Sequence, residues 1–553
     1  MKRLKPNHPK DFYEWQEYAK TIEPVHISWL KQAKTPGEYA GVDVLTGIPV
    51  SRNRFLVGVL LFSKTIKERS PEKNIGLMVP SSVGGAITIM SIMSLGKTVV
   101  NLNFTSGKKS LQNAAKMAEL KTIYTSKKFI EKMLDKGVDL VSFFPDINIV
   151  YLEDVKEAIS MGRKLKTLLL SKILSASAIE KKFFKKVNGN DTAAILFSSG
   201  SEGSPKGIEL SHTNLSANAK QASIALKIQK NDVFMSTLPT FHSFGFLATT
   251  LLPLSYGSPI VFHADPTEVE NVAHAIEKYN GTIMAGTPTL LRMYIVNKKV
   301  STHMLSSIRF VVSGAEKLTI EVAEDFQLKF NKPIYQAYGC TETSPGACIN
   351  LPDTEHNNGN IIINNKPGKV GKALIGTQFK IVDPETMEQL KTGEDGLILI
   401  GGPQVMKRYL GMASKTAEVI EIMDGVRWYN SGDKGNLDSD GFLTIVDRFS
   451  RFAKIGGEMV SLSAIEEQAQ QSLETPELEL VAVAIEDKKK GEKIVLLVTE
   501  NIDLNTIKSA LLRDEVPPLM IPSKVILIDE VPKLGTGKTD FSASQKIAQV
   551  YIS

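Results

Sequence analysis

The chain has few cysteines and no long uninterrupted hydrophobic run. Its 553 residues include two cysteines, Cys340 and Cys348, so there is no disulfide framework to build and a reducing compartment is expected. The most apolar stretch, 75–102, is interrupted by Pro80 and by two adjacent glycines, which favours a buried strand and helix over a membrane span. The basic first residues are followed by polar ones, which argues against a secretory signal. We therefore expect a cytoplasmic protein.

A strong charge of either sign is also absent. The net charge of +6 over 553 residues is too dilute by itself to indicate nucleic acid, and we expect no nucleic-acid partner. Hydrophobic content of 42% and charged content of 23% are ordinary for a soluble globular enzyme. At roughly 100 to 200 residues per domain, the length predicts several packed units.

Short apolar runs recur along the chain, with helical patterns between most of them. They are 75–79, 98–102, 148–152, 193–197, 259–263, 282–286 and 309–314. This alternation predicts an α/β architecture with parallel sheets. Denser glycine and alternating strands predict a small β-barrel-like subdomain at about 368–447, and shorter strands and helices follow it. We therefore expect a large N-terminal domain, 1–447, and a small α+β C-terminal domain, 448–553.

The most informative motif is SSGSEGSPKG, residues 198–207. Its glycines let the backbone turn tightly so that N–H groups can face phosphate oxygens, while serine hydroxyls add donors and Lys206 adds positive charge. An apolar run precedes it, and a helical pattern with start signals at Ser211 and Asn214 follows, so we expect strand, loop and helix. A Walker A loop is excluded because the motif ends Pro-Lys-Gly. The alternatives are a phosphate cradle and a flexible surface loop.

A separate basic segment, 161–186, has eight Lys or Arg residues and one acid. Leu165, Leu169, Ile173 and Phe183 are near helical spacing within it. Such a segment could be a basic amphipathic helix that lies on anionic lipid at the inner face of a membrane. The alternative is a solvated helix and linker.

Three more motifs follow in the second half of the chain: QAYGCTETSP (336–345), WYNSGDKGNLDSDGFLTIVDRFSRFAKIGGEMVS (428–461) and a glycine-flanked loop near the C-terminus. The first follows a predicted strand, and the second has an acid in a predicted tight turn. Their polar and charged residues are Tyr338, Thr341, Glu342, Asp433, Arg448, Lys454, Glu458 and Lys538. Singly each motif is weak, because most such side chains are merely solvated.

Together the four motifs resemble the adenylate-forming superfamily of acyl-CoA synthetases, peptide-synthetase adenylation domains and firefly luciferase. They occur in order across about 190–540. Within that superfamily, SGSEG, FHSFG (241–245), GAEKL and RFAKIGGEMVSL are similar to the synthetase domain of bacterial bifunctional 2-acylglycerophosphoethanolamine acyltransferase/acyl-acyl carrier protein synthetases. The acyltransferase half has no counterpart here, so we expect a free-standing synthetase. The resemblance implies two α/β subdomains and a β-barrel-like subdomain in the large domain, and a mobile C-terminal domain.

The resemblance also implies the chemistry. A carboxylic acid, here a long-chain fatty acid, would be joined to the α-phosphate of ATP with release of pyrophosphate, with Mg²⁺ as cofactor. The phosphopantetheine thiol of acyl carrier protein or coenzyme A would then attack the acyl adenylate. The first step brings two anions together, which requires local positive charge.

By the same resemblance, each candidate residue has a role. The β- and γ-phosphates would be held by Ser198, Ser199, Gly200, Ser201, Gly203 and Lys206. Glu342, with Ser201, would hold Mg²⁺, and Thr341 would touch the α-phosphate. Adenine would be enclosed by Gly314, Ala315, Glu316, Tyr338 and Gly339. Asp433 and Arg448 would bind the ribose hydroxyls, and Lys538 would neutralise charge at the α-phosphate.

The C-terminal domain is expected to rotate between the two half-reactions. That rotation would withdraw Lys538 and bring in the thiol-transfer loop, whose residues are Lys454, Gly456, Gly457 and Glu458. The hinge position holds Ser450, where most relatives carry Asp or Lys. His242 would line the channel between the acyl pocket and the thiol, and its alternative is a packed loop histidine.

The leading interpretation is an acyl-acyl carrier protein or acyl-CoA synthetase. An acyl-AMP ligase that serves one biosynthetic carrier protein is the second, and a non-catalytic lipid or nucleotide sensor is the third. Retention of Lys206, Glu342, Asp433 and Lys538 argues against a sensor, which needs no catalytic lysine.

Overall fold

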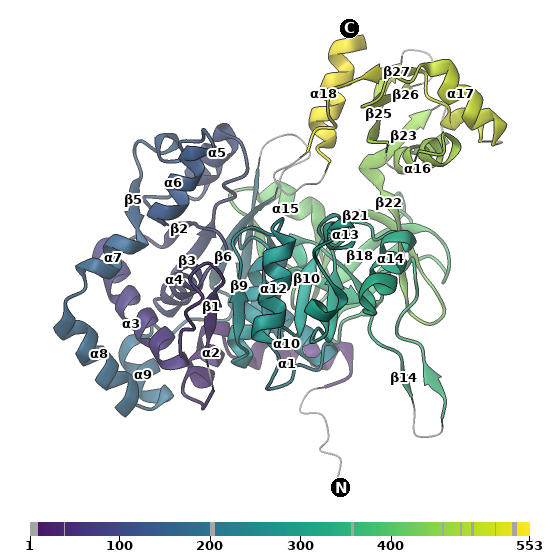
Figure 1. The fold of residues 1–553 in the computed structure, drawn as a ribbon. Coiled ribbons are helices and arrows are strands. Elements are labelled where there is room, and N and C mark those ends of the chain that lie inside the picture. Colours follow the sequence, from purple (N-terminus) through teal and green to yellow (C-terminus); the bar gives the residue numbers. More distant parts are fainter. Residues whose placement is uncertain are drawn as a thin grey trace.

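The computed structural model describes residues 9–37, 39–198, 205–355, 359–455, 458–475, 478–487, 491–514, 516–533 and 539–552. A large N-terminal domain holds two sheets of seven and eight strands, and a smaller C-terminal domain projects from one end of it (Figure 1). The α/β prediction is confirmed.

The seven-stranded sheet has the order β19-β7-β6-β3-β2-β4-β5. Its strands are β2 (Asn74–Met78), β3 (Thr98–Asn101), β4 (Thr122–Thr125), β5 (Asn148–Tyr151), β6 (Thr192–Ser198), β7 (Lys206–Ser211) and β19 (Arg408–Tyr409). The five strands from β6 to β5 run parallel, whereas β7 and β19 each pair antiparallel with their neighbour.

The eight-stranded sheet has the order β1-β9-β8-β10-β11-β12-β13-β16. Its strands are β1 (Gly41–Asp43), β8 (Phe234–Ser236), β9 (Ile260–Phe262), β10 (Ile283–Gly286), β11 (Phe310–Ser313), β12 (Ile334–Gly339), β13 (Gly346–Ile349) and β16 (Lys372–Ala373). The first six are parallel, and β13 and β16 close the edge in antiparallel pairing.

Helices fill the space between the two sheets and cover their outer faces. The inner layer consists of α2 (Val25–Ala33), α3 (Arg52–Arg69), α4 (Val83–Ser94), α10 (His212–Ala225) and α11 (Leu252–Tyr256). The outer helices are α12 (Val269–Tyr279), α13 (Pro288–Val296) and α14 (Ile320–Phe330) on one sheet and α5 (Lys108–Met117) and α6 (Lys127–Asp135) on the other.

The strand sequences explain this layering. On β11, Phe310 and Val312 face the inner core while Val311 faces the outer one, as the two-residue period of a strand requires. Because both faces are buried, these strands are continuously apolar, which is why the sequence pattern was readable.

The remaining part of the N-terminal domain is a five-stranded antiparallel sheet. It contains β17 (Gln378–Val382), β18 (Gly396–Gly401), β20 (Ile420–Met423), β21 (Val426–Leu437) and β22 (Leu443–Arg448). The smaller elements of the domain are α1 (Phe12–Thr21), α7 (Leu152–Ala158), α15 (Ala413–Val419), β14 (Thr354–Glu355) and β15 (Ile361–Ile362).

The C-terminal domain packs three helices around its own five-stranded mixed sheet. Its elements are β23 (Phe452–Ile455), β24 (Glu458–Ser461), α16 (Leu462–Ser472), β25 (Leu480–Asp487), β26 (Gly491–Val498), α17 (Leu504–Arg513), β27 (Lys524–Leu527) and α18 (Phe541–Ile552). It has its own apolar cores, one with α16 and α17 and one with α18. The 3-10 helix Phe449–Arg451 connects it to β22.

One local prediction is wrong. The motif at 198–207 lies between two antiparallel strands, β6 and β7, and helix α10 begins after β7. Ile208 and Leu210 alternate into the inner core, so the KGIELS stretch is a strand. The start signals are correct, because the Ser211 hydroxyl and the Asn214 side chain form a reciprocal capping box at the first turn of α10.

The basic segment forms two helices, α8 (Met161–Ile173) and α9 (Ala176–Phe183). They lie at the outer edge of the molecule beside α3 and α7 (Figure 1). Phe183 packs against the inner core, so it does not lie with the exposed Leu165, Leu169 and Ile173. Among the described residues, no helix is both long and apolar enough to cross a membrane.

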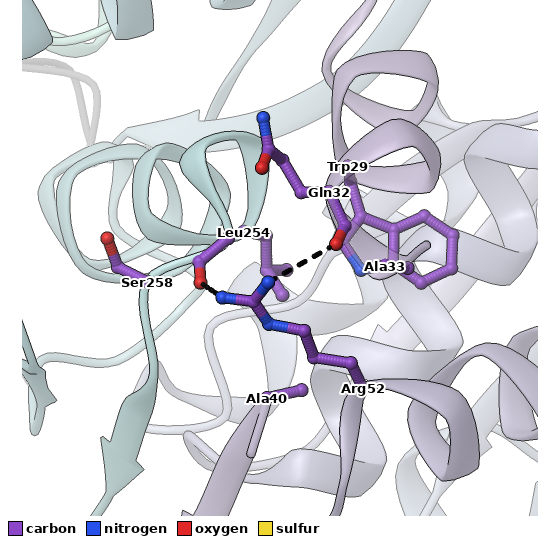
Figure 2. A pocket seen from close by; sticks show the side chains of 8 residues that line it. Trp29, Gln32, Ala33, Ala40, Arg52, Leu254 and Ser258 are labelled. Atoms are coloured by element: carbon purple, nitrogen blue, oxygen red, sulfur yellow. Dashed lines mark hydrogen bonds between the residues drawn. The ribbon is translucent and has the colours of Figure 1, made fainter. Parts of the chain in front are cut away.

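Arg52 clamps three segments of the inner layer together. Its guanidinium donates to the main-chain oxygens of Gln32 at the end of α2 and of Gly257 after α11. Figure 2 shows the Arg52 side chain close to Gln32 and Leu254. It also donates to the carbonyl of Pro36 at 3.0 Å. Arg52 also lines a small pocket with Gln32 and Gly257, and because its guanidinium is bonded to main-chain carbonyls we assign it a structural role.

Candidate functional site

The phosphate-loop motif is held by the β6–β7 hairpin of the seven-stranded sheet. Ser198 is the last residue of β6 and pairs in register with Lys206, the first residue of β7. Ser199, Gly200, Ser201 and Gly203 lie outside the described residues. The hairpin fixes where Lys206 leaves the sheet.

Lys206 and Glu342 both contact Tyr409. The Lys206 ammonium lies 5.4 Å from the centre of the Tyr409 ring, within the range of a cation–π contact. The Tyr409 hydroxyl donates to Glu342 Oε1 at 2.8 Å, and both side chains are buried. Burial, and then the charge of Glu342, raise the pKa of Tyr409, so this phenol stays a donor. One tyrosine thus connects the predicted phosphate-binding lysine to the predicted metal ligand.

Thr341 and Glu342 stand in a 3-10 turn after β12. Gly339 ends β12, where an added Cβ would lie 1.8 Å from the carbonyl oxygen of Pro345, so only glycine fits. The main-chain oxygen of Glu342 accepts from the Met406 N–H at 2.7 Å. These contacts hold the turn against the segment that leads to β19.

The FHSFG motif lies beside this turn. The Ser243 and Thr341 hydroxyls are 3.2 Å apart, and His242 packs edge-on against Phe241 with ring centres 4.6 Å apart. At Gly245 a Cβ would meet the carbonyl oxygen of Pro239 at 2.3 Å. The chain is therefore bent tightly here, and His242 directly precedes Ser243, the residue that contacts Thr341.

A second group of predicted residues centres on Asp433. Its Oδ2 accepts from the Tyr338 hydroxyl at 2.5 Å, and its Oδ1 accepts from Arg448 Nε at 2.9 Å. Burial is the main reason that the pKa of Tyr338 is raised, and the charge of Asp433 adds to it. Asp433 lies within β21, paired with Arg448 of β22, so the prediction that it sits in a tight turn is wrong. Antiparallel pairing brings the acid and the arginine together.

The predicted adenine segment follows β11. Gly314 is buried, Ala315 adopts a positive φ of 74°, and Glu316 Oε2 accepts from the Thr289 hydroxyl at 2.8 Å. The next residue, Lys317, forms an ion pair with Glu467 of α16. This segment therefore contacts the C-terminal domain.

The predicted hinge and transfer loop lie beyond β22. Ser450 is exposed in the short 3-10 helix. Lys454 lies in β23 and Glu458 begins β24, so the transfer loop is a β-hairpin. Gly456, Gly457 and Lys538 lie outside the described residues.

The sequence analysis did not single out three residues that contact the candidate site or adjoin the predicted hinge. Tyr409 sits in a two-residue strand, Ser243 inside a predicted motif, and Arg451 directly after the predicted hinge. No periodic pattern marks them.

No described cluster of three or more His, Cys, Asp or Glu side chains is placed to hold a metal ion. Glu342 supplies a single buried carboxylate. This arrangement suits a magnesium ion that takes most of its ligands from phosphate and water.

Fold and site define the class of protein. The AMP-binding enzyme family matches residues 62–410, which is more than half of the chain and includes Lys206, Glu342 and Tyr409. The chain therefore belongs to the AMP-binding enzymes, the adenylate-forming superfamily, and is an ATP-dependent acyl-adenylate-forming ligase.

Similar proteins are named as ligases that act with coenzyme A. The Dictyostelium discoideum "Probable 4-coumarate--CoA ligase 2" is 32% identical over 422 residues, 72% of this chain and 72% of that protein. The Arabidopsis thaliana "4-coumarate--CoA ligase-like 8" is 27% identical over 84% of this chain and 80% of that protein. The likeness to acyl-acyl carrier protein synthetases stays a prediction.

Solved structures share the fold. ATP-bound MatB from Rhodopseudomonas palustris has a TM-score of 0.77 at 20% identity and covers 96% of this chain and 100% of its own. The Bacillus subtilis O-succinylbenzoate coenzyme A synthetase MenE, in complex with ATP and a magnesium ion, has a TM-score of 0.74 at 21% identity, with 94% and 98% covered.

Proposed function

We propose that this protein activates a long-chain fatty acid as its acyl adenylate and transfers the acyl group to a phosphopantetheine thiol. In the first step a carboxylate oxygen bonds to the α-phosphorus of ATP and pyrophosphate leaves. In the second step the thiol gives up its proton to solvent and its sulfur bonds to the acyl carbon, while the bond from that carbon to the AMP oxygen breaks and AMP leaves with the oxygen. The observation that supports the proposal is the contact of Lys206 and Glu342 with Tyr409, because a triphosphate with its metal ion needs a cation and an acid close together.

In the first step the protein must bring two anions together. Lys206, with Ser198, Ser199, Gly200, Ser201 and Gly203, would hold the β- and γ-phosphates. Thr341 would donate to the α-phosphate. Lys538 would approach from the C-terminal domain and neutralise the charge that develops there.

Mg²⁺ fits the donor set at Glu342, with Ser201 as a further ligand. When bound it would neutralise phosphate charge. The Tyr409 hydroxyl already occupies one lone pair of Glu342 Oε1, so the carboxylate is oriented and keeps its other oxygen for the ion.

The nucleoside would lie along the second group. Asp433 has acceptor capacity beyond the bonds from Tyr338 and Arg448, since a carboxylate offers about four lone-pair sites. It would accept the ribose hydroxyls. The segment Gly314, Ala315 and Glu316, with Tyr338 and Gly339, would enclose adenine.

For the second step, His242 would line the path of the thiol. The hairpin with Lys454, Gly456, Gly457 and Glu458 would be brought to the site by rotation about Ser450. Relatives named CoA ligases support coenzyme A as the acceptor, and the sequence motifs support acyl carrier protein. Both are arms of the test.

The test is acid-dependent exchange between ATP and labelled pyrophosphate, over saturated fatty acids of different length and 4-coumarate. We expect exchange to need Mg²⁺ and to be greatest with a long chain. Transfer is then measured with coenzyme A and with holo-acyl carrier protein.

Glu342→Gln is the matched variant, because it keeps the shape of the side chain and removes its charge. It should reduce exchange by about 10²-fold or more without altering the melting temperature. If exchange stayed within a fewfold of wild type, the assignment of Glu342 as a metal ligand would be wrong. Greater activity with 4-coumarate would replace the fatty acid as substrate.

A further inference from the structure

Helix α8 presents a continuous apolar row to solvent. Met161, Leu165, Leu169 and Ile173 are 68, 60, 58 and 69% exposed. They are spaced four residues apart, so each lies about 40° from the next around the helix and all share one face. Four large aliphatic side chains in one such row are far more than the scattered exposed residues of an ordinary surface.

The opposite face of α8 holds the helix to the protein. Ser171 is fully buried, and its carbonyl oxygen accepts from the Lys34 ammonium. Arg163 pairs with Glu68 of α3 at 3.6 Å. The helix is therefore held to the protein on this side and turns the row of four exposed side chains outward, where a surface helix of a soluble domain presents polar side chains.

Basic residues surround the row. On α8, Lys166 and Lys172 are exposed beside the apolar side chains, and the helical geometry places them on either side of the row. Four more exposed lysines, Lys181, Lys182, Lys185 and Lys186, lie on α9 and directly after it. Among the described residues, Arg163 alone of the eight cations of 161–186 forms an ion pair.

We propose that this surface, α8 with the lysines of α9, binds the face of a bilayer that contains anionic phospholipid. The apolar row would enter the boundary between headgroups and acyl chains, and the lysines would meet lipid phosphates. At 13 residues the helix is about 20 Å long and lies in the membrane plane without crossing it. The proposal does not depend on the substrate.

The charges favour a membrane over a second copy of the chain. A two-fold contact through α8 would set each lysine cluster near its own symmetry mate, and the segment offers a single acid, Glu180, against its eight cations. The aliphatic row has no counterpart on a nucleic-acid backbone. A lipid surface supplies both the negative charge and the apolar layer.

The experiment is flotation of the full-length protein with vesicles. Vesicles of phosphatidylcholine alone are compared with vesicles that contain 30% phosphatidylglycerol, at about 50 and 500 mM salt. We expect binding only to the anionic vesicles, weakened at least tenfold by the higher salt. Binding to both kinds of vesicle alike, or to neither, would overturn the proposal.

Two variants separate the contributions. Leu165→Ser with Leu169→Ser removes apolar surface that is already exposed, and Lys181, Lys182, Lys185 and Lys186→Gln remove four charges. Each set should reduce binding at least tenfold with unchanged melting temperature and exchange activity.

Each variant has a matched control on another face. Ile320→Ser with Leu328→Ser removes two exposed apolar side chains, 55 and 86% exposed, from α14. A fourfold Gln variant of the exposed lysines 230, 298, 508 and 546 removes the same charge. Equal losses of vesicle binding in the controls would mean that binding depends on net charge and total exposed apolar surface, not on this surface, and would overturn the proposal. A concentration-dependent dimer that Leu165→Ser with Leu169→Ser abolishes, without vesicle binding, would assign the surface to a second copy.

Discussion

Tyr409 joins two groups that the sequence places more than a hundred residues apart. Its hydroxyl bonds Glu342 and its ring faces the Lys206 ammonium. A carboxylate that accepts a fixed hydrogen bond keeps one orientation, which lowers the cost of ordering it when an ion binds. Tyr409 is therefore a positioning residue for the proposed metal site.

Tyr409→Phe should separate the two contacts, because phenylalanine keeps the ring beside Lys206 and loses the bond to Glu342. The Mg²⁺ concentration that half-saturates pyrophosphate exchange should rise roughly tenfold, as expected for one hydrogen bond to a charged group. Activity at saturating Mg²⁺ should return to within a fewfold of wild type.

Tyr294→Phe is the control, since Tyr294 is equally buried but lies in the outer core against α12. Its Mg²⁺ requirement should not change. If Tyr409→Phe lowered the maximum rate without altering the Mg²⁺ requirement, the bond to Glu342 would have no positioning role.

At this scale the sequence predicted the residue types of the site better than their contacts. Glu342, Asp433 and Arg448 are recognisable from motifs. The bond from Tyr338 to Asp433 is not, because it joins two different sheets. Tyr409 gave no signal because one tyrosine in a short polar stretch fits many environments.

Among the elements, α10 shows why patterns fail inside a helical layer. Asn214, Asn218 and Gln221 are buried and follow one face of the helix. Asn214 Nδ2 donates to the carbonyls of Pro403 and Val405 at 2.8 Å, and Asn218 bonds both main-chain groups of Gly346. This polar row supports the segments on either side of the site. It reads from sequence as an exposed face.

Helices α2 and α10 also meet through two buried histidines. The rings of His26 and His212 are 5.2 Å apart. Burial, and then the charge of His212, lower the pKa of His26 to about 3, and burial lowers the pKa of His212 to about 4. Asp191 opposes the second shift. Both imidazoles are therefore neutral at pH 7.

The sign of the pH effect follows from these depressed values. An unfolded histidine has a pKa of about 6.5, so between pH 6.5 and about 4 the unfolded chain binds protons that the folded one does not. The contribution of the two neutral, buried histidines to the free energy of unfolding is fully present above pH 6.5 and is lost as the pH falls. We expect the melting temperature to drop steeply between pH 6.5 and 4.5, measured by circular dichroism.

His26→Leu should make that drop shallower, because one of the two groups no longer titrates. His274→Leu is the control, since His274 is exposed on α12. An unchanged slope in His26→Leu would show that other groups cause the acid sensitivity.

At the scale of the whole molecule, the N-terminal and C-terminal domains are held together by a few polar contacts. Lys317 and Glu467 form an ion pair between them, with side chains 68 and 52% exposed, which contributes at most about 1 kcal/mol. Near the connection, Asp447 accepts from the hydroxyls of Ser461 and Ser463 at 2.5 and 3.0 Å. Contacts of this kind can exchange, as the proposed rotation requires.

Lys538→Ala should divide the two half-reactions if that rotation occurs. Adenylate formation should fall by about 10²- to 10³-fold, the usual loss for one preorganised charge. With synthetic acyl adenylate supplied, thioester formation should stay near the wild-type rate, because the lysine would have left the site.

Lys533→Ala is the neighbouring control, since Lys533 pairs with Glu479 on the surface of the C-terminal domain. It should leave both steps unchanged. Equal losses in both steps for Lys538→Ala would exclude the rotation.

The two arginines on either side of Ser450 anchor the connection between the domains, one in each domain. Arg448 is tied to Asp433 in the large body. Arg451, 5% exposed, is tied to Glu466 and stacked 3.8 Å from the centre of the Phe541 ring in the small one. Only Phe449 and Ser450 stand between, so three peptide links, at most about 11 Å of extended chain, separate the two anchored residues. In the proposed rotation a link this short would act as a pivot, about which the C-terminal domain turns without moving away from the large domain. Reorientation should therefore slow in a viscous solvent and be indifferent to protein concentration.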